Sequence, residues 1–426
     1  MNTKVRPATR LSGKPVIPGD KSISHRALMF GALAKGKTRV SHLLDSEDVN
    51  STWRCLEAMG VKITRQKEEI LVEGSGIRGL KAPSQILDCG NSGTTIRHMM
   101  GILAGQSFDA TLTGDASLSK RPMKRIAEPL RLMGAQIELT AGNLAPVKMS
   151  GVGKLKAIDY SLPVASAQLK SALLLAALYA EGTTVIRGLI QSRDHTERFL
   201  PYFGVPISVT EAAISVRGGG ELLGADVKVP GDPSTAAFWI AGATLVPGSD
   251  IELDNISLNP TRTGFIEVLR RMGARIETEI TSSEPEPVGK IRIRYAPLKG
   301  TVVLPHEVPS LVDEVPLLAV LACFAEGETD IQGAEELRVK ESDRIEATAK
   351  NLRAMGAKVE TKHDGFVIHG PQKLKGAQID SMDDHRIAMA FSIAALQAEG
   401  QTEIIDSQCV AISYPGFYND LDILTQ

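Results

Sequence analysis

The sequence has little of what marks several common protein classes. Its formal net charge is -2 and aromatic residues make up 4% of the chain. Surfaces that bind nucleic acid or anionic membranes carry excess positive charge, and those that bind single strands add stacking aromatics. The longest apolar run, near Leu173–Tyr179, is far too short to span a bilayer. We therefore expect neither nucleic acid nor a membrane among the partners.

Cysteine is also scarce. The four cysteines form no CxxC pair, and their spacing fits no zinc site; they are Cys55, Cys89, Cys323 and Cys409. Scattered free thiols suit a reducing compartment. The segment Met1–Val16 lacks the apolar core of a signal peptide and the composition of a transit peptide. These features predict a cytoplasmic protein without a structural metal.

Internal repetition is the main positive feature of the sequence. A strand, a turn and an amphipathic helix recur six times at a spacing of roughly 65–80 residues. The copies begin at Pro15, Leu87, Tyr160, Val227, Val302 and Gln378. Each turn carries Asp, Asn, Ser or Pro just before the helical run, and these residues are typical of helix N-caps and first turns.

Two further patterns follow these helices. The first, as in AKGKTRV and AEGTTVI, supplies a Gly suited to a helix C-cap and then a β-branched strand. The second is a helix ending in Met-Gly or Phe-Gly and then a strand, which occurs five times. We expect the N-terminal segment Lys4–Leu11 to supply the missing sixth strand, which would tie the chain ends together.

The patterns together predict a βαβαβ-like unit repeated six times, with three units in each of two domains. One domain is expected to span 20–230, and the other to combine 1–19 with 231–426. The two crossings, near Gly19–Asp20 and Pro230–Asp232, both read Pro-Gly-Asp and are plausible hinges.

Two apparent nucleotide motifs do not fit their surroundings. The segment Gly31–Thr38 matches GxxxxGK[ST], but it ends a predicted helix and precedes a strand, whereas a P-loop follows a strand and opens a helix. The segment Gly74–Gly79 matches GxGxxG, but Pro83 interrupts the helix that should follow. We interpret the first as a helix end and the second as a turn.

Charged and polar side chains gather at the turns that open the repeated helices. They are Lys21, Ser22 and Arg26; Asn91, Gly93 and Arg97; Ser166, Gln168 and Lys170; Asp313 and Glu314; and Asp383, Asp384, His385 and Arg386. Further basic segments are Ser119–Pro122 and Arg338–Arg344. Helix N-termini attract anions, and Arg binds phosphate or carboxylate with two hydrogen bonds. Such turns facing one cleft would suit two phosphorylated, carboxylated substrates, with Asp313 and Glu341 as candidate acid and base.

The alternative for each charge is a solvated face or a structural salt bridge. That interpretation is preferred for isolated residues such as Lys37, Arg54 and Arg131. Repetition at equivalent turns favours the binding interpretation for the others.

Six segments in order resemble the 5-enolpyruvylshikimate-3-phosphate (EPSP) synthase family: PGDKSISHRAL, GNSGTTIR, SKRPM, SAQLKSALL, RVKESDRI and DDHRIAM. The resemblance runs from about Pro15 to Pro415. It implies the enolpyruvyl transferase fold, an inside-out α/β barrel of two domains. Each domain has three βαβαββ repeats with parallel helices, and the active site lies in the cleft between the domains.

The resemblance also implies the chemistry. The family moves the enolpyruvyl group of phosphoenolpyruvate to the 5-hydroxyl of shikimate-3-phosphate and releases phosphate, on the shikimate pathway to chorismate and aromatic amino acids. It needs no cofactor or metal, and we expect a monomer. Its inhibitor glyphosate occupies the phosphoenolpyruvate position.

The resemblance assigns roles to individual residues. Contacts to shikimate-3-phosphate fall on Lys21, Ser22, Arg26, Ser166, Gln168, Arg193, Asp313 and Lys340. Contacts to phosphoenolpyruvate fall on Lys21, Gly93, Arg121, Gln168, Arg344 and Arg386. Asp313 would accept the proton near the 5-hydroxyl. Glu341 would give a proton to the methylene carbon, assisted by Lys21.

Several positions depart from the commonest enterobacterial and plant pattern. They are Asp20, His25, His98, the segment Arg193–His195, and Ile412, where the family usually has Lys. These features resemble the class II branch of the family. They predict glyphosate inhibition that is weaker than in the common bacterial type.

Two other functions compete with this one. UDP-N-acetylglucosamine enolpyruvyltransferase shares the fold but usually has a loop Cys a few residues before Arg-Pro, where this chain has Ala116. A non-enzymatic anion-binding repeat protein, or a degenerate synthase, would bind phosphate without turnover. A phosphate-release assay with both substrates separates all three.

Overall fold

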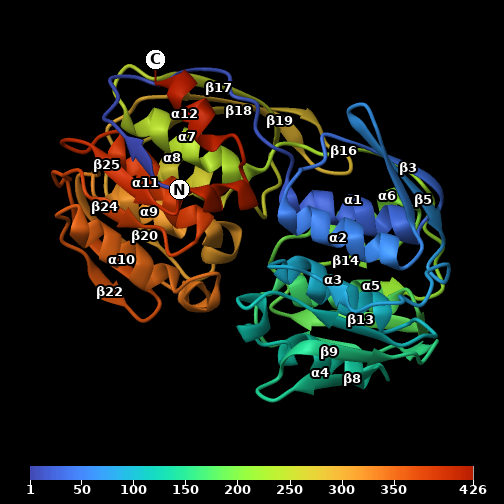
Figure 1. The fold of residues 1–426 in the computed structure, drawn as a ribbon. Helices are drawn as coiled ribbons and strands as arrows, with labels where there is room; N and C mark the ends of the chain where they lie inside the picture. Colours follow the sequence, from blue (N-terminus) through green and yellow to red (C-terminus); the bar gives the residue numbers. More distant parts are fainter. Residues whose placement is uncertain (426) are drawn as a thin grey trace. The chain divides into compact units, whose positions relative to one another are not determined.

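The computed structural model describes residues 1–425, which divide into two compact units. Unit 1 combines Met1–Pro18 with the chain from Pro230 onward, and unit 2 is Gly19–Val229 (Figure 1). Each unit has a continuous hydrophobic core of its own. The chain therefore passes twice between the units, once after Pro18 and once after Val229.

Unit 2 contains three similar runs of helices and strands. The first is α1 (Lys21–Leu33), β3 (Lys35–Ser41), α2 (Glu47–Ala58), β4 (Lys62–Gln66) and β5 (Glu69–Ser75). The second is β6 (Leu87–Asp88), α3 (Gly93–Leu103), β7 (Ala110–Thr113), α4 (Lys124–Leu132), β8 (Gln136–Thr140) and β9 (Leu144–Ser150). The third is β11 (Asp159–Leu162), α5 (Ala167–Ala177), β13 (Thr183–Gly188), α6 (His195–Tyr202), β14 (Ile207–Val209) and β15 (Ala213–Arg217), followed by β16 (Asp226–Lys228).

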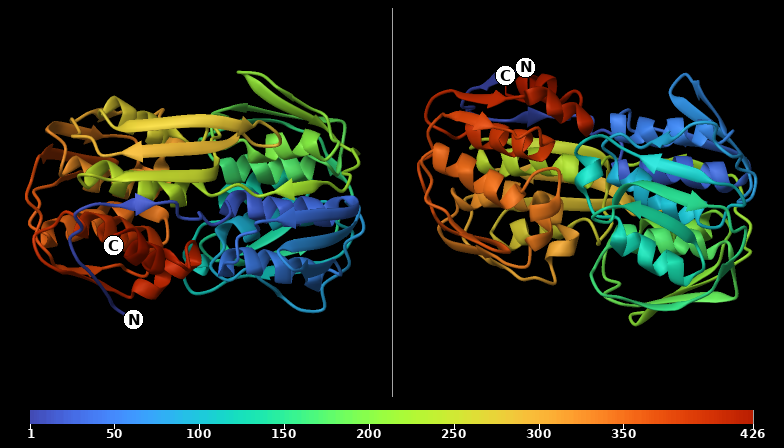
Figure 2. Two further views of the ribbon diagram at one scale, coloured as in Figure 1. Left: turned by 90° about the horizontal axis from the view of Figure 1, so that it is seen from above. Right: turned by 60° about the horizontal axis from the view of Figure 1, so that its bottom comes forward.

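Unit 1 repeats the plan. It has α7 (Pro233–Leu245), β17 (Asp250–Ser257), α8 (Gly264–Arg271), β18 (Arg275–Ser282) and β19 (Val288–Arg294). Then come β20 (Val302–Val303), α9 (Val315–Ala322), β21 (Gly327–Ile331), α10 (Arg344–Ala354), β22 (Glu360–Lys362) and β23 (Gly365–Gly370). The last run is β24 (Gln378–Asp380), α11 (His385–Ala395), β25 (Thr402–Ile405) and α12 (Phe417–Leu424). The left view of Figure 2 shows the long β18–β19 hairpin in yellow and orange.

The sheets share one topology. In the order β6-β7-β9-β8, the first pair is parallel and the other two pairs are antiparallel. The order β20-β21-β23-β22 has the same pattern. A helix connects the two parallel strands in each case, because parallel strands need a crossover connection. Repeats two and five are thus βαβαββ, as the resemblance implied, whereas the sheet of the sixth repeat has three strands in the order β1-β25-β24.

The first strands of repeats one and four are exchanged between the units. The short β2 (Ser12–Gly13) pairs in parallel with β17 of unit 1, and β16 pairs in parallel with β3 of unit 2. The expectation that Pro15–Pro18 forms the first strand of repeat one was therefore wrong. The strand lies earlier and belongs to the other unit, because the chain crosses between strand and helix at each Pro-Gly-Asp sequence.

The N-terminus completes the sixth repeat, although with different bounds from those predicted. The strand β1 (Thr3–Val5) pairs antiparallel with β25, with Thr3 opposite Ile404. It ends before Pro7, which cannot donate to a ladder. The predicted span Lys4–Leu11 was therefore too long and began one residue late.

The first helix of each repeat lies in the interior, and the sheets lie around it (Figure 1). All 13 residues of α7 are buried. A helix buried on every side is apolar all round instead of amphipathic. The prediction of an amphipathic helix was wrong for α7 for this reason.

The glycines expected at helix C-caps lie further along. The C-caps of α1, α9 and α11 are Ala34, Cys323 and Leu396. Gly36, by contrast, lies inside β3 with φ +96°, and a Cβ there would meet nothing within 4 Å. Glycine is needed at this position because the backbone is left-handed, and not because the packing is close.

Among residues 1–425, no helix is long and apolar enough to cross a membrane.

Candidate active site

The central helices of unit 2 open with side-chain caps. Asp20 accepts a hydrogen bond from the backbone N–H of Ile23 at 2.8 Å at the start of α1. Ser92 and Ser166 cap α3 and α5 in the same way. These caps fix the first turns and leave other amide groups of each turn available to an anion.

Lys21 lies in the first turn of α1 and pairs with Asp48 of α2. The distance from Lys21 Nζ to Asp48 Oδ2 is 3.1 Å, and the lysine side chain is 19% exposed. Asp48 therefore fixes the position of this cation. Sequence reasoning did not single out Asp48, because it lies on a different helix and outside the repeated turns.

Arg26 is buried beneath the same turn. Its Nε donates to Thr196 Oγ1 at 2.8 Å, its Nη2 to Ser171 Oγ at 2.7 Å, and its Nη1 to the carbonyl oxygen of Ser22 at 2.9 Å. Only 4% of the residue is exposed. Arg26 thus joins α1, α5 and α6 and places a positive charge under the turn that holds Ser22.

Two guanidinium groups surround Gly93. Arg97 Nη1 donates to Gln168 Oε1 at 2.6 Å, and Arg121 Nη2 donates to Asn91 Oδ1 at 2.7 Å. A Cβ on Gly93 would lie 3.0 Å from Arg97 Nη1 and 3.5 Å from Arg121 Nη1. The structure therefore brings Gly93, Arg121 and Gln168 together, as their assignment to one ligand requires. Arg97 joins them, and its position one helical turn after Gly93 was the signal for it.

Lys170 does not belong to this group. Its Nζ lies 2.6 Å from Glu197 Oε1 and donates to the carbonyl oxygens of Ile190 and Ser192. Burial raises the pKa of Glu197, although Lys170 opposes that shift. Lys170 therefore forms a structural salt bridge and supports the loop that contains Arg193.

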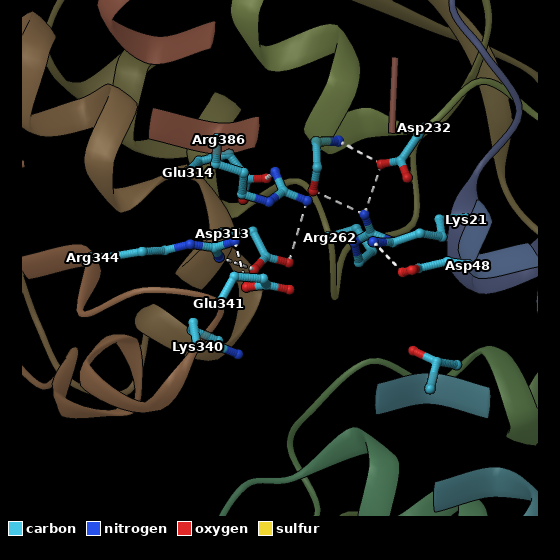
Figure 3. Close-up of polar contacts among 12 residues, drawn as sticks. Lys21, Asp48, Asp232, Arg262, Asp313, Glu314, Lys340, Glu341, Arg344 and Arg386 are labelled. Carbon is cyan, nitrogen blue, oxygen red and sulfur yellow. Dashed lines mark hydrogen bonds and ion pairs between the residues drawn. The ribbon is translucent and has the colours of Figure 1, made fainter. Parts of the chain in front are cut away.

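In unit 1, Arg344 joins three carboxylates, and Figure 3 shows its contacts with Asp313 and Glu341. Its Nη2 donates to Glu341 Oε2 at 2.7 Å, its Nη1 to Asp313 Oδ1 at 3.3 Å, and its Nε to Asp384 Oδ2 at 2.8 Å. The arginine side chain is 1% exposed. Burial opposes its charge, but Asp384, Glu341 and Asp313 outweigh burial and raise the pKa of Arg344.

Asp384 is the support of this cluster. It caps α11 by accepting from the backbone N–H of Arg386 at 3.0 Å, and it accepts from Ser342 Oγ at 2.9 Å. Burial would raise the pKa of Asp384, but the charge of Arg344 outweighs it and the pKa is lowered. Asp384 therefore stays ionised and holds Arg344 in place.

Arg386 and Lys340 complete the group in unit 1. Arg386 Nη2 lies 3.7 Å from Asp313 Oδ2, and Arg386 Nη1 lies 3.7 Å from Glu314 Oε1. Lys340 Nζ lies 3.5 Å from Glu336 Oε1, on the 3-10 turn that precedes it. Asp313 thus contacts both arginines, whereas Lys340 contacts a different carboxylate.

The predicted residues divide between the two units. Unit 2 holds Lys21, Ser22, Arg26, Gly93, Arg121, Ser166, Gln168 and Arg193, and unit 1 holds Asp313, Lys340, Glu341, Arg344 and Arg386. Unit 2 offers cations and capped helix N-termini, which suit anion binding. Unit 1 offers two carboxylates beside two arginines, which suit proton transfer next to an anion. In the described part of the chain, no group of three His, Cys, Asp or Glu side chains is placed to hold a metal ion.

The fold is that of the enolpyruvyl transferases. A solved structure, the enolpyruvyl transferase NikO from Streptomyces tendae, matches 99% of this chain and 96% of its own, with a TM-score of 0.78 and 18% identity. At that identity the match concerns the fold alone.

The sequence comparison is more specific. The profile of EPSP synthase (3-phosphoshikimate 1-carboxyvinyltransferase) matches residues 5–421. The 3-phosphoshikimate 1-carboxyvinyltransferase of Acidithiobacillus ferrooxidans is 53% identical over 97% of this chain and 95% of its own length. A solved EPSP synthase from Acinetobacter baumannii has a TM-score of 0.89 at 44% identity, over 99% of this chain and 98% of that one. The chain belongs to the EPSP synthase family and is a transferase.

Proposed function

We propose that this chain transfers the enolpyruvyl group of phosphoenolpyruvate to the 5-hydroxyl of shikimate-3-phosphate and releases phosphate. The observation that carries this proposal is the cluster in which Arg344 contacts both Asp313 and Glu341. The reaction needs one group to accept a proton from the hydroxyl and another to protonate a carbon. Two carboxylates held on one fixed cation supply such a pair.

We assign the residues the roles that the family resemblance implies. Shikimate-3-phosphate binds Lys21, Ser22, Arg26, Ser166, Gln168, Arg193, Asp313 and Lys340. Phosphoenolpyruvate binds Lys21, Gly93, Arg121, Gln168, Arg344 and Arg386. The pairing of Arg97 with Gln168 and the closeness of both arginines to Gly93 support an anion at that position.

The reaction proceeds by addition and elimination. The 5-hydroxyl oxygen attacks C2 of phosphoenolpyruvate as Asp313 accepts its proton. Glu341, assisted by Lys21, protonates C3, so the double bond becomes a tetrahedral carbon. Loss of a proton from C3 then restores the double bond as the carbon–oxygen bond to phosphate breaks. Fixed positive charge stabilises the charge that develops in each step.

The proposed contacts come from both units, so binding of the two substrates requires residues of both. The exchange of strands at the two crossings supports a pair of hinges. The same account includes a monomeric, cytoplasmic enzyme and inhibition by glyphosate at the phosphoenolpyruvate position.

A phosphate-release assay tests the function. Purified protein should release phosphate when both substrates are present and not with either alone. Replacing shikimate-3-phosphate by UDP-N-acetylglucosamine tests the other enolpyruvyl transfer, for which Ala116 stands where a loop Cys is usual. Phosphate release with the nucleotide sugar alone as acceptor would contradict the proposal.

A further inference from the structure

The two crossings of the chain are joined directly within unit 1. They are the Pro-Gly-Asp sequences that begin at Pro18 and Pro230. The backbone N–H of Asp232 donates to the carbonyl oxygen of Pro18 at 2.9 Å. The N–H of Gly231 donates to the carbonyl oxygen of Asn255 at 2.6 Å. The second crossing is thus anchored to β17, and the first crossing is anchored to the second.

The side chain of Asp232 is fixed by a buried arginine. Arg262 Nη2 donates to Asp232 Oδ1 at 2.9 Å (Figure 3). The same Nη2 donates to Ser234 Oγ at 2.9 Å. The same Asp232 oxygen accepts from the backbone N–H of Ser234 at 2.8 Å and caps α7. The side chains of Arg262 and Asp232 are 2% and 8% exposed. One guanidinium therefore holds the carboxylate that sits beside both crossings.

Arg262 is itself held by a supported loop. Its backbone N–H donates to the carbonyl oxygen of Asn259 at 2.8 Å. Asn259 Nδ2 donates to Glu286 Oε2 at 2.8 Å, and Asn259 Oδ1 accepts from both the N–H and the hydroxyl of Thr261. Glu286 lies between β18 and β19. A chain of contacts thus runs from this hairpin through Arg262 to Asp232.

Stability alone is a weak reason for a charged pair at this place. Desolvation of two charges can cost more than their attraction returns, and a well-packed apolar pair is often at least as stable. What the charges add is geometry, because the fork of an arginine fixes the direction of each acceptor. Here the fixed groups are the cap of α7 and the residue that binds the first crossing.

We propose that Arg262 is a positioning residue for the transfer reaction, which acts by fixing Asp232 and through it the register of the two crossings. This inference rests on the proposed function, in which residues of both units bind one substrate pair. The hydrogen bonds from Arg262 to Asp232 and Ser234 lie within unit 1, so we expect loss of Arg262 to leave the anion-binding groups of unit 2 in place. It lets the crossings move independently, so the complex that forms is less often the reactive one. The effect should appear in kcat and much less in the binding of shikimate-3-phosphate.

The test compares four variants of the full chain: Arg262→Met, Arg262→Lys, Asp232→Asn and Ile368→Ala. Ile368 is a buried residue of β23 in the same unit, outside this chain of contacts, and Ile368→Ala serves as a matched destabilised control. For each protein we would measure the thermal midpoint, kcat, both KM values and the calorimetric affinity for shikimate-3-phosphate.

We expect Arg262→Met to lower kcat by about tenfold or more, with the affinity for shikimate-3-phosphate within about threefold. Arg262→Lys should recover part of kcat, and Ile368→Ala should keep kcat within about twofold. If Arg262→Met does not fold, Arg262→Lys and Asp232→Asn should show the same separation of kcat from affinity. Full kcat in the folded Arg262 variants, or an equal loss in Ile368→Ala, would overturn the inference. An inactive wild-type protein would instead overturn the proposed function.

Discussion

Arg97 of α3 and Gln168 of α5 are joined by a hydrogen bond of 2.6 Å from Nη1 to Oε1. This bond links the helix openings of repeats two and three. It also holds the guanidinium of Arg97 beside Gly93, at the position where a Cβ would contact it. The anion pocket proposed for unit 2 thus depends on Arg97 in two ways. Arg97 supplies positive charge, and its hydrogen bond holds Gln168 in position.

Replacing Arg97 with Met should weaken the binding of phosphoenolpyruvate more than the binding of shikimate-3-phosphate. A hydrogen bond to a charged group contributes about 1.5–3 kcal/mol, so kcat/KM for phosphoenolpyruvate should fall by about 10- to 100-fold. Steady-state kinetics with each substrate varied measures the difference. Arg131→Met, on α4, is the control, because its guanidinium donates to the carbonyl oxygen of Ile137. Equal losses for both substrates in Arg97→Met would contradict the assignment.

Gly93→Ala should discriminate between phosphoenolpyruvate and glyphosate. The added methyl would lie 3.0 Å from Arg97 Nη1, which can retreat by a few tenths of an ångström but then narrows the pocket. Glyphosate is the longer ligand, so its inhibition constant should rise about tenfold more than the KM for phosphoenolpyruvate, a difference of roughly 1.4 kcal/mol. If the two constants rise together, Gly93 is only a tightly packed turn.

Glu341→Gln should stop the chemistry and spare binding. The amide keeps an oxygen for Arg344 to donate to, but it has no proton to transfer. General acid–base groups contribute about 10²–10⁴-fold in rate, so kcat should fall within that range. Calorimetry should show unchanged binding of shikimate-3-phosphate. Glu346→Gln, an exposed residue in the first turn of α10, is the control. Turnover of Glu341→Gln within about tenfold of wild type would sink the proposed role.

Two buried histidines should make the protein sensitive to acid. In residues 1–425 neither ring nitrogen of His98 has a hydrogen-bond partner, and burial, with Arg26, His25 and Arg97 nearby, lowers its pKa well below the ordinary value. Burial, with Lys21 and Arg26, lowers the pKa of His25 likewise. Acid therefore protonates the unfolded chain first. The stability from these neutral histidines is complete above about pH 6.5 and is lost as the pH falls below it.

His98→Leu removes one of these groups. At about pH 5.5 it should recover roughly 1.4 kcal/mol of the acid loss seen in wild type. The urea midpoints at pH 8 and pH 5.5 measure this for wild type, His98→Leu and His363→Gln, which changes an exposed histidine. The same acid loss in all three proteins would show that His98 is not responsible.

The repeats were predictable because each carries its own local signals. Asp20, Ser92 and Ser166 cap their helices as their residue types predicted. The exchange of β2 and β16 between the units was not predictable, because strand pairing is set by long-range contacts that leave no local pattern. The sequence of α7 shows no amphipathic period because the helix is buried on every side, and that burial results from tertiary packing.

The candidate site residues were likewise predictable only where local sequence signals marked them. The repeated turns predicted Lys21, Gly93, Gln168 and Arg386 as site residues. They also suggested Lys170, which the fold turns inward to Glu197. They gave no sign of Asp48 or Arg262. Asp48 lies on α2 and Arg262 lies in the turn before α8, and their partners are brought to them only by folding.

The most direct test of the central claim is phosphate release by the purified chain with both substrates present. The account predicts stoichiometric release of phosphate with formation of the enolpyruvyl product, none with either substrate alone, and a loss of about 10²-fold or more in Glu341→Gln. Binding of shikimate-3-phosphate without any phosphate release by the wild-type chain would contradict it, and would identify a protein that keeps the anion sites of the family without its chemistry.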